Sequence, residues 1–115
     1  MTEVKATVFS DKIGYKGDNL YNGKTIKGKT YYFYGELSTN PEVKNSKDLN
    51  YSALGKLPHL HPLKITYGDK SEIGLKGDVG RGGVDYEPQI DLHTKLAEKL
   101  GFKGRGIVKI ENVTI

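Results

Sequence analysis

The chain has 115 residues, no cysteine, and 18 basic against 14 acidic side chains, for a net charge of +4. This length predicts a single domain, and the lack of cysteine excludes a disulfide framework, a thiolate metal site and a cysteine nucleophile. No apolar run approaches the ~18 residues of a membrane span, so no membrane insertion is expected. The positive charge favours anionic partners. Because no dense basic stripe or nucleic-acid-binding motif accompanies it, nucleic acid is not expected among them.

The first half of the chain predicts short strands separated by turns. Residues 4–8 alternate apolar and polar side chains, as a strand with one buried face does. Residues 14–29 are rich in Gly, Asn, Asp and Lys, which is typical of loops, with an Asn-Gly turn signal at 22–23. The aromatic run at 30–34 favours a strand, and the polar stretch 38–50 predicts a loop or insertion.

A hairpin is predicted next. Residues 63–67 and 71–75 both alternate, and a Gly-Asp pair at 68–69 joins them. The stretch 77–83 has four glycines in seven residues and predicts a glycine-rich loop.

One helix is predicted near the C-terminus. Leu92, Leu96, Ala97 and Leu100 share one helical face, and Asp91 precedes them as an N-cap candidate. A glycine at position 101 ends the helix, and residues 106–110 predict a final buried strand. With 15 glycines available for bends and close backbone contacts, a small, mostly β barrel is the expected fold class.

The order of these features is similar to that of a known family. Over residues 54–110 the chain presents a Leu-Pro step at 57–58, the hairpin, Gly-Asp-x-Gly at 77–80, Ile-Asp-Leu at 90–92 and Leu-Gly-Phe at 100–102. This set resembles the RlpA-like double-psi β-barrel family, which is related to expansin and barwin-type domains.

The resemblance implies a six-stranded double-psi β-barrel with an open groove that binds polysaccharide. Family members bind or act on peptidoglycan or plant-wall glycans. Some are lytic transglycosylases, some are non-catalytic binding or wall-loosening modules, and a few inhibit proteases.

Asp78 is the first catalytic candidate, because in the family the aspartate of the Asp-x-Gly step is taken as the catalytic acid. Cleavage of a glycosidic bond requires a carboxylic acid that protonates the leaving oxygen. Lys76 lies two residues earlier, on the same strand face if the strand continues, and Arg81 is near. Their charges would lower the pKa of Asp78, and a simple turn-forming role for Asp78 stays open.

Other carboxylates are weaker candidates. Glu36 matches a glutamate that catalytic members carry upstream, so it is a second catalytic candidate. Asp85 is either a groove residue or solvated. Asp91 is expected to be structural, as a helix cap or a tie for a loop. Those catalytic members also carry a histidine shortly before the Leu-Pro step, and this chain has Leu54 there.

Glycan contacts are expected from aromatic and basic groups. Tyr15 and Tyr34 are candidates for stacking on sugar rings, although packing of alternate tyrosines in the core is the other interpretation. Arg81 is expected to bind glycan. Gly77 and Gly80 are expected to be structural, because residues without a side chain let a sugar approach the backbone.

Metal and cofactor sites are not expected. His59 and His61 could share one side of a strand and bind zinc with His93 as a third ligand, but Pro62 disfavours a regular strand there. The glycine-rich segments lack the Gly-Lys-Ser/Thr step of a phosphate loop.

Three functions are therefore open. The protein is a peptidoglycan lytic transglycosylase, a non-catalytic barrel that binds cell-wall glycan, or a protein-binding module such as a protease inhibitor or a phage-tail domain that contacts the wall. As an isolated domain it is expected to be a monomer. A wall target implies an extracytoplasmic location, and because no signal peptide is recognisable at residues 1–4, export within a longer chain or delivery on a virion is expected.

Overall fold

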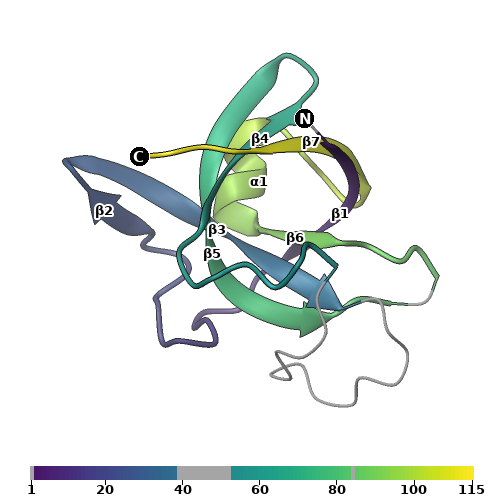
Figure 1. Cartoon of the computed structure of the whole chain (residues 1–115), viewed down its shortest axis with the longest axis horizontal. Helices are drawn as coiled ribbons and strands as arrows, with labels where there is room; N and C mark the ends of the chain where they lie inside the picture. Colours follow the sequence, from purple (N-terminus) through teal and green to yellow (C-terminus); the bar gives the residue numbers. More distant parts are fainter. Residues whose placement is uncertain (1, 39–52, 84) are drawn as a thin grey trace.

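The computed structural model describes residues 2–38, 53–83 and 85–115. Within these ranges, seven strands and one helix follow one another (Figure 1). In order they are β1 (Thr2–Phe9), β2 (Lys24–Ile26), β3 (Lys29–Ser38), β4 (Pro62–Tyr67), β5 (Lys70–Arg81), β6 (Ile90–His93), α1 (Thr94–Leu100) and β7 (Gly106–Asn112).

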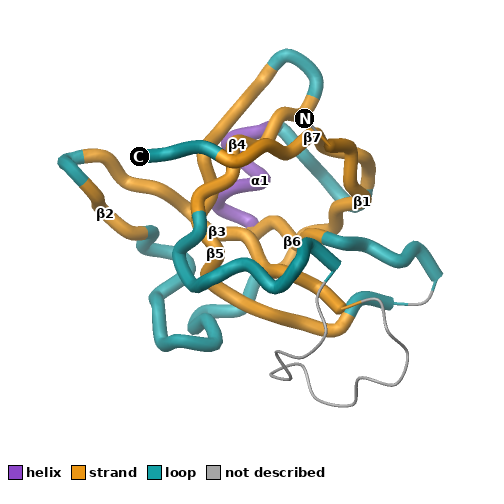
Figure 2. Tube along the Cα trace, in the orientation of Figure 1, coloured by secondary structure: helices purple, strands orange, loops and turns teal. Residues whose placement is uncertain are grey.

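Six of the strands close into a barrel. The neighbours run β3-β5-β4-β7-β1-β6, and β6 pairs back with β3. The pairs β1–β6 and β3–β5 are parallel, and the other barrel pairs are antiparallel. Figure 2 shows the strands as a ring in projection, with β2 extending outside it next to β3. The expected six-stranded barrel with one short helix near the C-terminus is confirmed.

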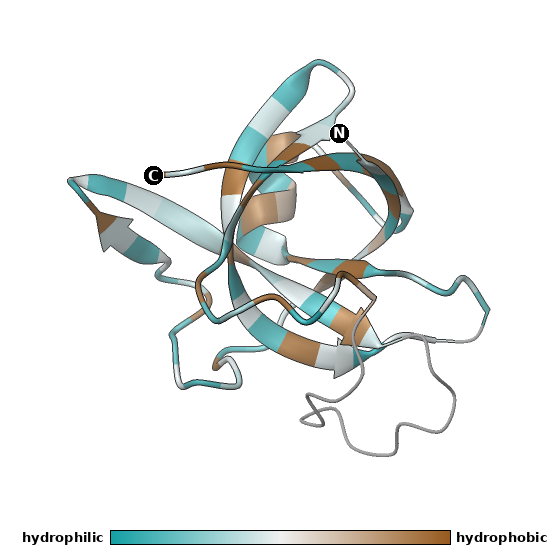
Figure 3. Cartoon of the chain, viewed as in Figure 1, coloured by the Kyte–Doolittle hydropathy of each residue, from teal (hydrophilic) through white to brown (hydrophobic). Residues whose placement is uncertain are grey.

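The barrel interior holds the main hydrophobic core. Bands of apolar and polar residues alternate along strands such as β7 (Figure 3). Because alternate side chains of a strand project to opposite faces, one set of them faces inward. Leu96, Ala97 and Leu100 of α1 pack against this inward set and close one end of the barrel. The inward set consists of Val4, Ala6, Tyr34, Leu63, Ile65, Ile90, Leu92 and Val108.

A second, smaller core lies on the outer face of the wall. Phe33 of β3 and Leu75 of β5 are fully buried there under Leu20. Leu20 belongs to the segment 10–23, which therefore covers this part of the barrel from outside. Because the segment is rich in turn-forming residues, it follows the outside of the wall without adding a strand to the barrel.

Two expected elements are wrong. The glycine-rich stretch that begins at Gly77 is no loop, because β5 continues through it to Arg81. Residues 90–92 are strand, since β6 pairs with both β1 and β3. The helix therefore starts only at Thr94, and its N-cap is His93 rather than Asp91.

The cap at His93 uses both ring nitrogens. Nδ1 accepts a hydrogen bond from the Lys95 N–H at 3.2 Å, and Nε2 donates to the Asp11 carbonyl at 3.0 Å. Burial lowers the pKa of His93, which favours the neutral ring that this arrangement needs. The predicted stop at Gly101 is confirmed, with the glycine in the left-handed conformation.

Two expectations concern other parts of the chain. The predicted loop at 38–50 lies outside the described residues, apart from Ser38 at the end of β3. In the described part of the chain, no helix is long and apolar enough to cross a membrane.

Candidate active site

A row of three residues crosses the outer wall of the barrel where β5, β3 and β6 lie side by side. Gly35 of β3 pairs with Asp78 of β5 on one side and with Asp91 of β6 on the other. Paired residues of neighbouring strands project from the same face, so both carboxyl groups stand on one face with the glycine between them. Two strand spacings separate their Cα atoms by roughly 10 Å.

A β-bulge places Asp78 in this row. As β3 advances one residue to Gly35, β5 advances two, from Lys76 to Asp78, so Gly77 is the extra residue. A Cβ on Gly77 would lie 2.5 Å from Cδ1 of Phe33, so a larger residue would force a shift. The bulge puts Lys76 and Asp78 on opposite faces of the wall, and the expectation that they share a face is wrong.

The row lines a groove of about 150 Å³. Two predicted site residues lie in it beside the aspartates, namely Gly80 and the exposed Arg81 at the end of β5. The groove thus combines three carboxyl groups, counting Asp11, with one guanidinium group. Its remaining lining residues are Phe9, Leu37 and Val79.

Asp91 is the carboxyl group whose environment favours a bound proton. Burial raises the pKa of Asp91 from 3.8 to about 6. The Thr7 hydroxyl donates a hydrogen bond of 3.0 Å to Oδ1 and lowers this pKa, while the negative charges of Asp11 and Asp78 raise it. A carboxyl group with a pKa near 6 suits a general acid at neutral pH.

Glu36 is held in a different arrangement. It is 2 % exposed and projects to the inner face of the wall, opposite the groove. Oε1 lies 2.8 Å from Nζ of Lys76 and accepts the Leu57 N–H at 2.7 Å, and Oε2 accepts the N–H groups of Leu54 and Lys56 at 3.0 and 2.9 Å. Both oxygens are therefore occupied in tying the segment 54–57 to the barrel.

Tyr15 is influenced by carboxylates of both arrangements, that of Glu36 and that of the groove. It is half-buried, and its ring meets His59 edge-on at 5.8 Å between centroids. Burial raises the pKa of Tyr15, and the charges of Glu36, Asp18 and Asp78 raise it further. The Lys76 ammonium group lies 5.7 Å from the centroid of the Tyr15 ring, so the ring lies beside the Glu36–Lys76 pair.

Tyr34 and Asp85 lie away from the groove. Tyr34 is completely buried in the barrel core, and its hydroxyl donates to the His61 carbonyl at 2.8 Å. Burial raises the pKa of Tyr34, and no ring face is left for a sugar. Asp85 is exposed on the connection between β5 and β6 and does not line the groove.

The three histidines have separate partners. Nε2 of His59 lies 2.5 Å from Oδ2 of Asp18, and Nε2 of His61 lies 2.7 Å from Oδ1 of Asn112. His93 caps α1. Among the residues that the structure describes, no group of three or more His, Cys, Asp or Glu side chains could hold a metal ion.

The chain matches no protein-family model and no curated protein.

Three residues of the groove carry no recognisable functional signal in the sequence. Phe9 and Asp11 lie at and just after the end of β1, and no motif distinguishes them. Gly35 sits in an ordinary β-prone run, and only the strand register shows that it separates two carboxyl groups. The sequence predicts a structural role for Asp91, and the burial of Asp91 beside other carboxylates, which no linear pattern shows, makes it a candidate for chemistry as well.

Proposed function

We propose that the protein binds the glycan strand of peptidoglycan in the groove and cleaves it as a lytic transglycosylase. The observation that carries this proposal is the pair of aspartates that flank Gly35, one of which has a pKa of about 6. Such a substrate would place the protein outside the cytoplasm, at the cell wall.

The two carboxyl groups take different roles in the proposed reaction. Protonated Asp91 gives its proton to the oxygen that leaves the anomeric carbon, and the glycosidic bond breaks. The Asp78 carboxylate stabilises the positive charge that develops on the sugar ring. The 6-hydroxyl of the same muramic sugar then attacks the anomeric carbon and returns its proton to Asp91, so that a 1,6-anhydro sugar forms and no water is consumed.

The surroundings of the groove support a glycan ligand. Arg81 lines the groove, and the charge of Asp78 helps to raise the pKa of the half-buried Tyr15. We assign these cationic and aromatic groups to contacts with an anionic, ring-containing polymer. The net charge of +4 favours approach to an anionic wall. Glu36 enters this proposal only as a structural carboxylate.

The test is mass spectrometry of sacculi incubated with the purified protein. We expect anhydromuropeptides from the unaltered protein and at least about 100-fold less from Asp91→Asn, since general acid catalysis contributes about 10²–10⁴ in rate. Asp78→Asn is also expected to lower the yield. Asp69→Asn, in the exposed turn between β4 and β5, is the matched control and should leave it unchanged.

Other outcomes separate the alternatives. Products with free reducing ends would show a hydrolase and overturn the transglycosylase chemistry. Pelleting with sacculi without any product would leave a binding module. Failure to bind any wall polymer at low salt would overturn the proposal as a whole.

A further inference from the structure

Two hairpins leave the barrel in different directions and form a fork. The hairpin β2–β3 and the hairpin β4–β5 diverge in Figure 1. Strands β3 and β5 pair with each other from Tyr32 and Gly74 onward. Before that point, residues 29–31 pair with β2 and residues 70–73 pair with β4. In the described part of the chain, the facing edges of these two segments are not paired with each other.

The geometry of the two turns shows which backbone groups face into the fork. Both hairpins have two-residue turns, at 27–28 and at 68–69, so the residues that close each turn form a hydrogen-bonded pair. Pairs with and without mutual hydrogen bonds alternate from there. Thr30 and Ser71 belong to pairs without mutual hydrogen bonds. Their N–H and C=O groups therefore point away from the hairpin partner and into the fork.

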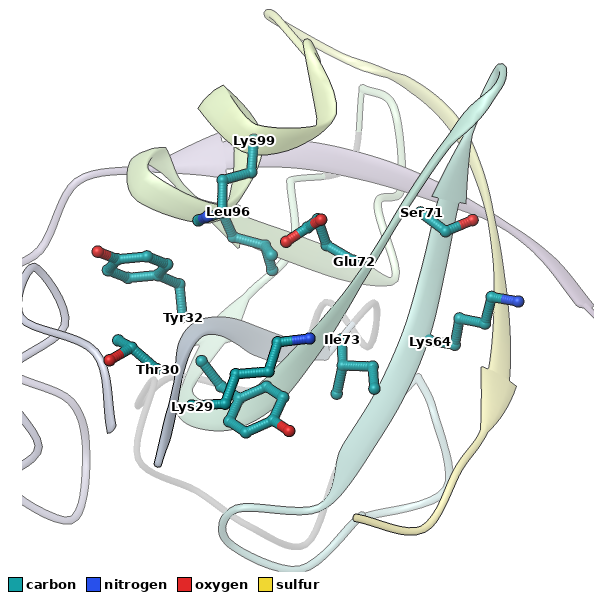
Figure 4. A pocket seen from close by; sticks show the side chains of 10 residues that line it. Lys29, Thr30, Tyr32, Lys64, Ser71, Glu72, Ile73, Leu96 and Lys99 are labelled. Atoms are coloured by element: carbon teal, nitrogen blue, oxygen red, sulfur yellow. The ribbon is translucent and has the colours of Figure 1, made fainter. Parts of the chain in front are cut away.

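A cavity of about 360 Å³ occupies the fork, which is within the range of ligand sites. Figure 4 shows Ile73 and Tyr32 on its strand sides, with Leu96 reaching in from α1. Thr30 and Ser71 are among the lining residues. The cavity thus offers apolar contacts together with two strand edges.

The charged residues of the fork are mainly basic. Lys29, Lys64 and Lys99 line it, against one acidic residue, Glu72. The ammonium groups of Lys29 and Lys99 lie 5.4 and 5.8 Å from the ring centroids of neighbouring tyrosines, and Lys64 is 3.7 Å from a carboxylate oxygen of Glu111. Because Lys64 is paired with Glu111, the surplus of positive charge comes from Lys29 and Lys99 against Glu72, and a ligand that carries carboxylates would complement it.

We infer that the fork binds an extended acidic peptide, which adds as a strand between the edges at Thr30 and Ser71. Backbone hydrogen bonds would supply affinity, and the lysines would select acidic side chains. The site is separate from the glycan groove, because the outer core of Leu20, Phe33 and Leu75 lies between them on the wall. The inference therefore does not depend on the proposed enzymatic activity.

A second copy of this chain is a poorer occupant. Of its two projecting hairpins, β2–β3 carries Lys24, Lys27 and Lys29, whose charges would repel the lysines of the fork. The β4–β5 hairpin carries two lysines against Asp69 and Glu72, so it brings no surplus of negative charge either.

The probe is a fluorescently labelled, capped hexapeptide in which Val and Glu alternate, titrated into the whole chain by fluorescence anisotropy. We expect saturable binding, and slowed hydrogen exchange of the Thr30 and Ser71 amides in NMR spectra. The matching Val-Lys peptide should not bind. The same Val-Glu peptide with N-methyl groups on the three valines should bind at least about tenfold more weakly, because strand addition needs the backbone N–H donors.

Protein variants locate the site. Lys29→Glu/Lys99→Glu should weaken binding by at least about tenfold. Lys103→Glu/Lys109→Glu makes the same change in net charge at exposed lysines outside the cavity and should have little effect. Equal losses in both double variants, or equal binding of the N-methylated peptide, would show general attraction of a polyanion and overturn the inference. Self-association that the peptide does not displace would also overturn it.

Discussion

At the scale of single residues, surroundings divide the carboxyl groups of this protein into different chemical roles. Burial, together with the charges of two other carboxyl groups, raises the pKa of Asp91 to about 6, although a hydrogen bond from Thr7 lowers it. Glu36 instead accepts three backbone N–H groups and the ammonium group of Lys76. The first arrangement favours a proton that can be given away, and the second uses the carboxylate to hold a chain segment in place.

The raised pKa of Asp91 predicts a specific dependence of stability on pH. Because the pKa is about 6 in the folded state against 3.8 ordinarily, the folded state holds this proton more tightly than the unfolded state. The corresponding stability is fully present below about pH 3.8 and is lost as the pH rises through about 6. Asp91→Asn removes this dependence. Between pH 3.5 and 7, the free energy of unfolding of Asp91→Asn should therefore rise relative to that of the unaltered protein by up to about 3 kcal/mol.

Urea unfolding of both proteins at several pH values measures this difference. Comparison with the variant cancels the contribution of His93, whose pKa is lowered by burial and which acts in a neighbouring pH range. Parallel pH profiles for the two proteins would contradict the assignment of a raised pKa to Asp91.

At the scale of elements, one inserted residue in β5 decides which side chains reach the groove. The bulge at Gly77 leaves Lys76 facing inward with Glu36 and turns Asp78 outward toward Gly35. The segment 10–23 also depends on this point, because a Cβ on Gly14 would lie only 1.9 Å from the Gly77 carbonyl oxygen. The bulge, the groove and the covering segment are therefore linked.

Gly77→Ala should destabilise the protein and disturb the groove together. The added methyl group would lie 2.5 and 2.7 Å from ring atoms of Phe33, and overpacking of this kind costs about 1–3 kcal/mol. Thermal unfolding measures the loss, and NMR shifts of the Asp78 and Gly35 amides report the local change. Gly83→Ala is the control, because its Cβ would meet nothing within 4 Å and its cost should stay within about 0.5 kcal/mol. Equal stability of the two variants would contradict the close packing at Gly77.

At the scale of the whole molecule, segments from outside the sheet pack against the barrel core. Helix α1 fills one end with Leu96, Ala97 and Leu100. At the inner face, the Glu36–Lys76 pair ties down the segment 54–57, and Nζ of Lys76 also donates to the Leu57 carbonyl at 2.5 Å. An ion pair buried to this degree stabilises only while both partners are present.

Removal of one partner of the Glu36–Lys76 pair should therefore destabilise the protein more than removal of both. Glu36→Ala leaves the ammonium group of Lys76 buried without its counter-charge and should cost about 3–5 kcal/mol. Glu36→Ala/Lys76→Met removes the stranded charge and should be more stable than the single variant, with a coupling energy of about 0.5–3 kcal/mol. Chemical denaturation of the set, with Lys76→Met as the second single variant, completes the cycle. A double variant less stable than Glu36→Ala would show that the pair does not act as a unit.

Local patterns were sufficient for much of the fold. Alternation at residues 4–8 and 63–75 predicted β1 and the β4–β5 hairpin, and the abundance of glycine indicated a barrel. The end of α1 at Gly101 also followed from a local signal. These features depend on side chains close together in the sequence, so they are visible without the partner strands.

The site depended on pairing between distant strands. Asp78 and Asp91 were recognisable as separate candidates, but their places on either side of Gly35 follow from the β5–β3–β6 register and from the bulge at Gly77. The sequence by itself thus determined the alternating patterns of the strands, the end of α1 at Gly101 and the residue types available for chemistry. The tertiary structure alone decided which face each carboxyl group occupies, how deeply it is buried and which charges surround it, because these are set by residues up to 84 positions away, as in the Thr7–Asp91 hydrogen bond.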